Sequence, residues 1–379
     1  MKKIKIVIGA NFGDESKGLI THYFTKENPN SIVVFHNGSA QRGHTVDYNP
    51  YFRHVYHHFG CGTAEGTPTY FADTFWIHPM EFHREYLDLV NSGITPPHCY
   101  YDPNARIVTP FDMLVDHATE AYITWDHQAP EHGSCGYGTW CATDRPEEST
   151  LRMAQFLNFN YIEYETIMNN IYKYCCAELI KRGVDLNKIP EYKAIFEDNT
   201  RYWNTIENFK NDLRFFISHA TPIDFNVIYR SYDNIIFEGA QGLGLDKDCG
   251  KEWHTTSNTG LVNPYNILKD KEDFEAEVCY VSRAYLTRHG IGSMDSEVQK
   301  KEINAAMIDK TNMPNEFQGS LRYGYVSDTE QKLRIAKDWS IVENDKRFVK
   351  SMAITHCNEF PDVKKEDYMS NNPYSVMKL

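Results

Sequence analysis

The chain has 379 residues, of which 41% are apolar, enough for a sizeable core in one large α/β domain or two ordinary ones. Its 39 Lys and Arg residues stand against 52 Asp and Glu residues, and the net charge of −13 argues against general binding to nucleic acid or anionic membrane. The nine cysteines form no CxxC or paired zinc spacing, and no run is apolar enough to span a membrane. We therefore expect reduced thiols and a cytoplasmic location.

The first elements predict a βαβ unit. Residues 4–9 (IKIVIG) and 32–35 (IVVF) are short β-branched runs typical of buried strands, and residues 14–27 between them suit a helix. Strands linked through a helix pair in parallel, so the opening predicts an α/β fold with a mostly parallel central sheet flanked by helices.

The rest of the chain continues this pattern. Residues 77–92 and 151–182 have helical spacing, and Gly183 is the expected end of the second helix. Residues 233–237 and 277–281 are candidate buried strands. Because we find no repeat and no linker rich in Pro, Gly or Ser, we expect residues 1–379 to form a single domain with elaborated loops.

The loop after the first strand, IGANFGDESKG at residues 8–18, has the composition of a binding site. It is not a Walker A motif, but the N–H groups at the start of the next helix and the Lys17 ammonium would complement a phosphate. Asp14 would hold Mg²⁺ or take a proton. The plainer alternative is an ordinary strand-to-helix turn with a solvated lysine.

Three further loops are rich in glycine. Residues 35–46 (FHNGSAQRGHTV) carry His44, a candidate acid because its usual pKa lies near neutrality, or else a histidine with a structural hydrogen bond. Residues 57–66 and 132–140 combine glycines with small hydroxyl or thiol residues. Since glycine lets backbone amides approach a ligand closely, these loops predict nucleotide phosphates held by the main chain.

The later motifs supply side chains suited to a base and a carboxylate. In FEGAQG at 237–242, Gln241 offers both a donor and an acceptor to a base edge, or is a structural amide at a turn. Arg288 lies in a turn bounded by glycines, and Arg322 is able to clamp a carboxylate, or else forms an exposed salt bridge.

In this order, the motifs resemble those of the adenylosuccinate synthetase family. Its opening motif GxQWGDEGKGK is similar to GANFGDESKG, which keeps Asp14, Glu15, Lys17 and Gly18. Its motif GGxNAGHT is similar to GSAQRGHT, FEGAQG is unchanged, and AYxTRxGxG matches residues 284–292. The resemblance runs from residue 4 to the end of the sequence and implies the family's fold, which is related to P-loop NTPases.

The resemblance implies a reaction. Members join L-aspartate to carbon 6 of a purine nucleoside monophosphate, using the γ-phosphate of a nucleoside triphosphate (ATP or GTP) and Mg²⁺. It implies that Asp14 takes the N1 proton, that His44 and Lys17 assist phosphoryl transfer, and that Asp14 and Gly43 hold the metal. The implied nucleotide and phosphate site comprises Gly13, Glu15, Ser16, Gly18, Gln41, Gly43, Thr45, Ser134, Cys135, Gln241, Thr256 and Asn358. The implied aspartate site comprises Arg288, Arg322 and Ser320.

Departures from the family motifs bear on the substrates. The loop NEFQGSLRYG is shorter than its family counterpart and has one arginine, Arg322, where members have several. Asn358 stands where members read guanine with an aspartate, and an amide is also able to pair with adenine, which predicts relaxed or ATP-like donor choice. The compact chain also resembles the phage-type branch that converts dGMP to 2-amino-2′-deoxy-N6-succinyladenylate on the way to diaminopurine DNA.

Several alternatives stay open at this point. Some members of the phage-type branch have serine where this chain has Asp14, although a carboxylate is able to accept hydrogen bonds from guanine N1–H and the 2-amino group. The drift of the other loops favours dGMP over GMP or IMP. Ordinary synthesis from IMP and GTP is one alternative, and a nucleotide-binding regulator that has lost catalysis is another. By family analogy we expect a homodimer in which Arg145 or Arg152 reaches the neighbouring subunit, and a location in the host cytoplasm if a phage encodes the chain.

Overall fold

The structure is a computed structural model that describes residues 1–126, 135–157, 160–248, 255–290, 292–294, 296–307, 320–360 and 363–379. Its centre is a ten-stranded sheet in the order β17-β16-β15-β11-β1-β10-β2-β5-β7-β9. All neighbours pair in parallel except β16 and β17, so the predicted parallel α/β architecture is confirmed. The strands are β1 (Lys2–Gly9), β2 (Ser31–Phe35), β5 (Thr69–Phe71), β7 (Cys99–Tyr101), β9 (Ala220–Pro222), β10 (Asn234–Gly242), β11 (Phe274–Arg283), β15 (Phe348–Thr355), β16 (Tyr368–Asn372) and β17 (Ser375–Lys378).

The opening βαβ unit forms as predicted, with one difference. Helix α1 (Lys17–Glu27) links β1 to β2, but β10 lies between these two strands in the sheet and pairs with both. Strand β10 carries the FEGAQG motif, so the order of the strands brings the carboxyl end of that motif beside the opening loop.

Helices cover both faces of the sheet, and alternate residues of one strand face opposite cores. In β2, Val33 and Phe35 pack into one hydrophobic cluster, and Ile32 and Val34 pack into another. This double burial explains the continuous apolar run of the strand. The helices are α1, α2 (Pro79–Asn91), α3 (Pro110–Asp126), α4 (Thr139–Asp144), α5 (Tyr161–Lys181), α6 (Pro190–Glu197), α7 (Asn199–His219), α8 (Phe225–Ser231), α9 (Val262–Leu268), α10 (Lys300–Asn304) and α11 (Asp328–Trp339).

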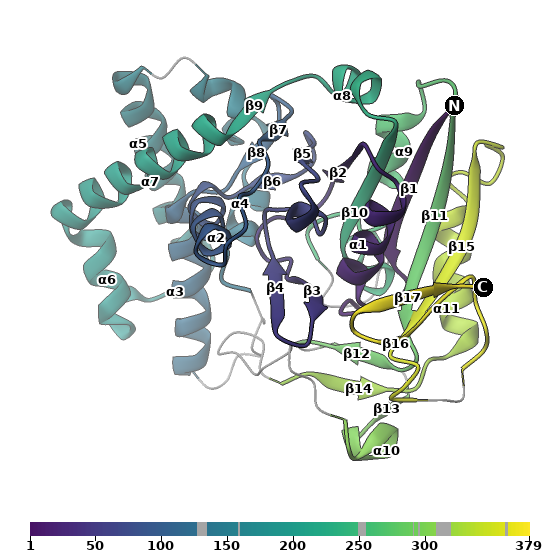
Figure 1. Cartoon of the computed structure of the whole chain (residues 1–379). Coiled ribbons are helices and arrows are strands. Elements are labelled where there is room, and N and C mark those ends of the chain that lie inside the picture. Colours follow the sequence, from purple (N-terminus) through teal and green to yellow (C-terminus); the bar gives the residue numbers. More distant parts are fainter. Residues whose placement is uncertain are drawn as a thin grey trace.

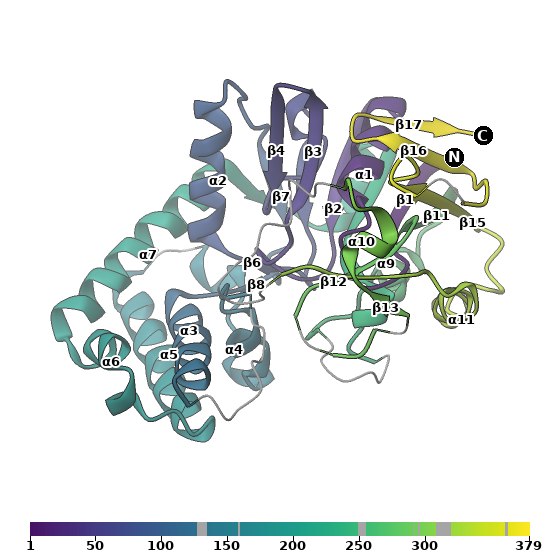
Figure 2. The same ribbon diagram turned by 90° about the horizontal axis from the view of Figure 1, so that it is seen from below.

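The helix predicted over 151–182 is shorter than expected. It begins at Tyr161, where the Asn160 side chain accepts a hydrogen bond from the Ile162 N–H at 3.0 Å and caps the helix. Met153–Phe156 form a 3-10 turn instead. The predicted end is confirmed, since Gly183 follows with a φ of 72°. Together, α3, α5, α6 and α7 gather at the end of the sheet away from β15 in both views (Figures 1 and 2).

Smaller sheets lie near the carboxyl ends of the central strands. Strands β3 (His44–Asn49) and β4 (Phe52–Tyr56) form a hairpin, and β12 (Leu286–Arg288), β14 (Arg322–Gly324) and β13 (Glu297–Val298) form a three-stranded sheet. Strands β6 (Trp76–Ile77) and β8 (Arg106–Ile107) pair separately, and the remaining 3-10 turns are Thr63–Glu65, Glu147–Ser149, Leu186–Lys188 and Leu243–Leu245. No helix in the described part of the chain is both long and apolar enough to cross a membrane. That residues 1–379 form one domain stays a prediction.

Candidate functional site

A pocket of about 500 Å³ opens at the carboxyl ends of the central strands, where open α/β sheets bind their ligands. The opening loop, the loop before β3, the tip of the β3–β4 hairpin and the turn between β16 and β17 all contribute to its lining. These segments come from both halves of the chain, and the parallel sheet brings them together (Figure 1). The predicted site residues among the lining are Gly13, Asp14, Glu15, Ser16, Lys17, Gly18, Gln41, Gly43, His44, Thr45, Cys135, Gln241 and Asn358.

The opening loop is held by Glu15 from within. One oxygen of its carboxylate accepts hydrogen bonds from the N–H groups of Asn11 at 2.8 Å and Gly13 at 3.1 Å. The other oxygen binds the Lys17 ammonium at 3.0 Å, and the two side chains are only 2% and 3% exposed. Lys17 is therefore not the solvated lysine of an ordinary turn. The Ser16 side chain makes no capping bond to α1, which leaves N–H groups at the helix start for an anion.

Backbone strain is concentrated at this pocket. Asp14, Ser16, Gln241 and His356 have φ values of 59°, 65°, 62° and 59°, in the left-handed region that favours glycine. All four line the pocket. Non-glycine residues in this conformation gather at functional sites, where the surrounding structure maintains the strain.

The Asp14 carboxylate faces the pocket beside His289. The distance from Asp14 Oδ2 to His289 Nε2 is 3.4 Å, and the Asp14 side chain is 26% exposed. Arg283 donates a hydrogen bond to the Asp14 carbonyl, and Thr287 Oγ1 donates to the Gly13 carbonyl at 3.3 Å. The segment 283–289 thus fixes the loop backbone while the carboxylate stays accessible to a ligand.

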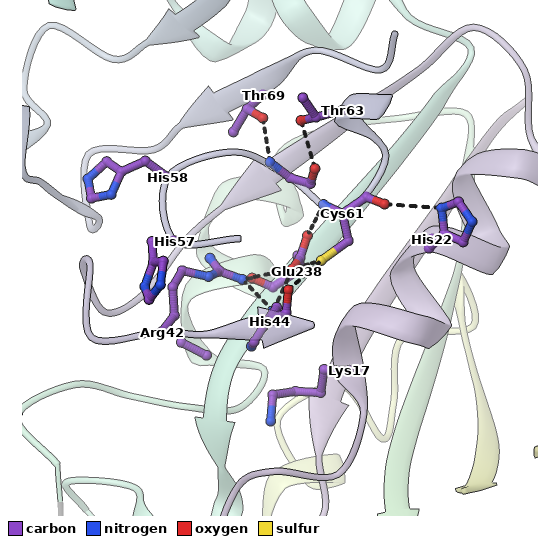
Figure 3. Close-up of polar contacts among 12 residues, drawn as sticks. Lys17, His22, Arg42, His44, His57, His58, Cys61, Thr63, Thr69 and Glu238 are labelled. Atoms are coloured by element: carbon purple, nitrogen blue, oxygen red, sulfur yellow. Dashed lines mark hydrogen bonds and ion pairs between the residues drawn. The ribbon is translucent and has the colours of Figure 1, made fainter. Parts of the chain in front are cut away.

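His44 is bound to a buried carboxylate (Figure 3). Its Nδ1 lies 2.5 Å from Glu238 Oε1, and the Cys61 N–H donates to Glu238 Oε2 at 3.1 Å. The Cys61 thiol donates to Oε1 at 3.0 Å, and Arg42 Nη2 lies 3.2 Å from the same oxygen. The sheet and the loops before β3 and after β4 together build this network around Glu238.

The protonation states follow from these contacts. Burial alone would raise the pKa of Glu238, but the charge of Arg42 and the hydrogen bonds from His44 and Cys61 outweigh it and lower the pKa to about 2. Burial first, and then the charge of Arg42, lower the pKa of His44 to about 4, against the opposing effect of Glu238. An ionised Glu238 accepts the Nδ1–H of a neutral His44, so Nε2 is the ring nitrogen left for the pocket.

Among the lining residues, Gln241 and Thr45 present buried polar atoms toward a ligand. Gln241 Oε1 and Thr45 Oγ1 have no hydrogen-bond partner within the described part of the chain. Buried polar groups are nearly always hydrogen-bonded, so these two atoms indicate contacts that a ligand would complete. Gln41 Oε1 already accepts a hydrogen bond from Thr139 Oγ1 at 3.3 Å, which joins the loop before β3 to the start of α4.

The structure does not place the remaining predicted residues in the pocket lining. Thr256 and Ser320 are exposed, and Ser134 lies outside the described residues. Arg288 and Arg322 are register partners in β12 and β14. Arg288 is 1% exposed and donates to the Ser293 carbonyl at 2.8 Å, whereas Arg322 forms a two-point ion pair with Glu297, as the plainer alternative for that residue predicted.

Sequence reasoning assigned no role to Glu238, Cys61 or His289. Glu238 lies inside the FEGAQG signature, at the carboxyl end of a predicted strand, and that placement was the available signal. Cys61 and His289 lie in glycine-rich loops, but nothing in the sequence pairs them with a partner. The turn formed by Asn372, Pro373 and Tyr374 also lines the pocket.

These features define a parallel α/β protein with a pocket that combines the start of a helix, a buried lysine, an accessible carboxylate and a carboxylate-bound histidine. The model of the adenylosuccinate synthetase family matches residues 6–322. The chain therefore belongs to the adenylosuccinate synthetase family.

Individual relatives agree with this assignment. The chain is 26% identical over 326 residues to the adenylosuccinate synthetase of Acaryochloris marina, and 27% identical over 324 residues to that of Trichodesmium erythraeum. Each match covers 80% of this chain, but only 65% and 66% of the relative. The chain thus spans slightly less than two thirds of the length of these relatives.

Two solved structures share the fold. The fully ligated adenylosuccinate synthetase of Plasmodium falciparum superposes with a TM-score of 0.67 and 18% identity, over 94% of this chain and 77% of that one. The succinoaminodeoxyadenylate synthetase of cyanophage S-2L, bound to dGMP and to dATP as an energy donor, gives a TM-score of 0.63 and 14% identity, over 100% and 95%.

Proposed function

We propose that this protein is a ligase that joins L-aspartate to carbon 6 of a purine nucleoside monophosphate at the expense of a nucleoside triphosphate. The observation that carries this proposal is the convergence of Asp14, Lys17 and His44 on one pocket, with His44 bound to an ionised Glu238. A proton acceptor, a phosphate-binding cation and an oriented histidine are what phosphoryl transfer to a weak oxygen nucleophile requires.

The proposed first step activates the 6-oxygen. The Asp14 carboxylate takes the N1 proton, which places negative charge on the 6-oxygen, and this oxygen bonds to the γ-phosphorus while the β–γ bridge breaks. Lys17 and the N–H groups at the start of α1 hold the phosphates. When the negatively charged phosphates are bound beside it, His44 takes a proton from solvent and donates a hydrogen bond from Nε2 to the phosphoryl group, while Glu238 holds Nδ1.

The second step forms the C–N bond. The aspartate amine attacks carbon 6 and forms the C–N bond, while the bond between carbon 6 and the phosphorylated 6-oxygen breaks. The 6-oxygen leaves as part of inorganic phosphate, and the amine loses its proton to solvent. The products are the succinyl-aminopurine nucleotide, a nucleoside diphosphate and inorganic phosphate. Arg288 and Arg322, with Ser320, are the proposed aspartate-binding residues; Arg322 would have to exchange Glu297 for the substrate carboxylate.

Mg²⁺ fits the residues present. Mg²⁺ favours hard oxygen ligands and is held by one or two carboxylates together with phosphates and water. The partly exposed Asp14 carboxylate offers such a ligand, and Gly43 lines the same pocket with its backbone. When bound, the ion would offset the charge of the triphosphate.

For the nucleotide substrate we favour dGMP, with GMP and IMP as alternatives. The Asp14 carboxylate is able to accept hydrogen bonds from both N1–H and the 2-amino group of guanine, and Gln241 adds an unpartnered acceptor. The similarity to the dGMP-bound cyanophage structure supports this choice. For the donor, Asn358 in the pocket lining supports ATP or a deoxy form as well as GTP.

We also propose a homodimer in the cytoplasm, and the burial of the two candidate arginines supports one of them as the residue at the subunit interface. Arg145 pairs with Asp112 at 3.1 Å with neither side chain exposed, so it is committed within its own subunit. Arg152 is partly exposed and pairs with exposed Glu147. We therefore assign Arg152, rather than Arg145, as the residue that reaches the neighbouring subunit.

A coupled phosphate-release assay tests the proposal. It combines L-aspartate and Mg²⁺ with dGMP, GMP or IMP, and with ATP, dATP or GTP, and the product mass is checked. We expect turnover on dGMP that is lost in Asp14→Asn and kept in Asp273→Asn, an aspartate with the same left-handed backbone (φ of 57°) outside the pocket lining. Turnover on IMP alone would identify ordinary adenylosuccinate synthesis instead.

A regulator without catalysis is the second candidate, and the Arg322–Glu297 ion pair favours it because it occupies the expected aspartate clamp. In that case no nucleotide combination would release phosphate, and Asp14→Asn would leave nucleotide affinity nearly unchanged.

A further inference from the structure

The guanidinium of Arg42 lies next to the His44–Glu238 pair (Figure 3). Its side chain has no exposed surface and lies over the ring of Phe35, with its Cζ 3.6 Å from the ring centroid. Nη2 lies 3.2 Å from Glu238 Oε1, donates to the Glu238 carbonyl at 3.2 Å, and lies 3.1 Å from His44 Nδ1. One nitrogen thus contacts both the carboxylate and the backbone of Glu238.

This arrangement is costly for a charged side chain. Nε and Nη1 of Arg42 have no hydrogen-bond partner within the described residues, although both are buried. A buried charge is stable only where it is paired, and the ion pair with Glu238 is the pairing that the surroundings supply.

Arg42 contributes to the pocket lining, but its side chain has no exposed surface. We therefore expect any effect of the guanidinium on the reaction to pass through its neighbours. Glu238 is contacted by Arg42, by the backbone and thiol of Cys61, and by His44. Together, these contacts fix the orientation of the Glu238 carboxylate, so that its Oε1 points toward Nδ1 of His44.

We propose that Arg42 is a positioning residue that clamps the Glu238 carboxylate, which in turn holds the His44 ring with Nε2 available to the pocket. The proposal deepens the proposed function and rests on it for the catalytic consequence. Its structural content, the orientation of His44 by the Arg42–Glu238 pair, is measurable without turnover.

Kinetics test the catalytic part. We expect Arg42→Ala to lower kcat about 10- to 100-fold, because a poorly oriented His44 would lose part of the rate enhancement that a positioned acid or base provides. The KM should change less than about threefold. In a His44→Asn background the same substitution should lower kcat no further, because Arg42 acts through His44. A loss of equal size in both backgrounds would overturn the proposal.

Two further variants control for folding. Arg182→Ala removes an arginine that is likewise stacked on an aromatic ring, Trp140, at 3.8 Å and paired with buried carboxylates, but that does not line the pocket. It should leave kcat close to wild type. Arg42→Lys keeps the charge but not the planar fork, and should lose about tenfold in kcat. If Arg42→Ala does not fold, Arg42→Lys decides alone, and wild-type kcat there would overturn the proposal.

A spectroscopic readout separates this inference from the proposed function. In protein labelled with ¹⁵N-histidine, the His44 ring of the wild type should show the Nδ1–H tautomer, and Arg42→Ala should show a mixture of tautomers. If the wild type lacks ligase activity, the proposed function fails and this readout still judges the clamp. An unchanged His44 spectrum in Arg42→Ala would overturn the clamp whatever the activity.

Discussion

Glu15 and Lys17 form an ion pair of 3.0 Å inside the opening loop, although only one residue separates them in the sequence. The pair is almost completely enclosed, and the same carboxylate holds two loop N–H groups. The charge of Lys17 is therefore fixed at the start of α1, next to the N–H groups that would share the same anion.

Glu15→Gln should destabilise the protein and weaken triphosphate binding. The substitution leaves the buried Lys17 ammonium without its counter-charge, and breaking a buried ion pair costs about 3 to 5 kcal/mol of unfolding free energy. Chemical denaturation and calorimetric titration with ATP measure the two effects. Asp328→Asn, which breaks the exposed ion pair with Lys364, should change neither. Wild-type stability in Glu15→Gln would show that the pair does not hold the loop.

Asp338 should make the protein less stable as the pH rises from about 4 to 6. Burial raises the pKa of Asp338 to about 6, against the hydrogen bonds that it accepts from the Leu261 N–H and the Tyr280 hydroxyl. Over this pH range the carboxyl ionises in the unfolded chain but stays protonated in the folded one, so rising pH favours unfolding by up to about 3 kcal/mol.

Denaturation curves from pH 4 to 7 check this prediction. Asp338→Asn should flatten the pH dependence, because the amide cannot ionise, whereas Asp270→Asn at an exposed position should follow the wild type. Parallel profiles for the wild type and Asp338→Asn would contradict the prediction.

Gly292→Ala should impair aspartate binding by displacing Arg288. A Cβ at Gly292 would lie 2.0 Å from Nη2 of Arg288, whose guanidinium is bound to the Ser293 carbonyl. Gly290→Ala is the matched control, since it also has a positive φ but no atom within 4 Å of the added Cβ. We expect the KM for L-aspartate to rise at least about tenfold in Gly292→Ala only. Equal values in the two variants would remove Arg288 from the aspartate site.

Mixing inactive subunits tests whether Arg152 acts across a dimer. Asp14→Asn and Arg152→Ala should each be inactive alone, yet a symmetric dimer with one subunit of each kind has one site with both residues intact. If the subunits exchange at random, about half of the dimers are mixed, and each mixed dimer has one intact site of two. The mixture should then recover about a quarter of the wild-type activity. Recovery of no activity, with dimers confirmed by light scattering, would place Arg152 outside the partner's site.

The sequence predicts local elements and loops well because their signals are local. The β-branched runs of β1 and β2, the glycine-rich opening loop and the Gly183 helix end are each encoded within a few residues. The insertion of β10 between β1 and β2 was not predicted, because hydrophobic periodicity does not specify which strand pairs with which.

The site was predictable residue by residue, but not as a network. Asp14, Lys17 and His44 were identified from their loops and do line one pocket, while their catalytic roles stay predictions. Glu238 is separated from His44 by 194 residues, and only the fold shows that its carboxylate binds that ring. The Arg322–Glu297 ion pair likewise depends on the pairing of β13 with β14. Strand β13 is too short for this pairing to be predicted from the sequence.

At the pocket, residues with a strained backbone lower the folding stability, but some of them carry side chains that the proposed reaction needs. Glycine at Asp14, Ser16, Gln241 or His356 would relax a left-handed conformation that costs other residues about 1 kcal/mol or more. At Ser16 this exchange would remove only a hydroxyl that makes no capping bond to α1. At Asp14 the same exchange would delete the carboxylate. If the proposed function holds, a selection for thermal resistance alone would enrich variants that fold better and have lost the carboxylate needed for the proposed reaction.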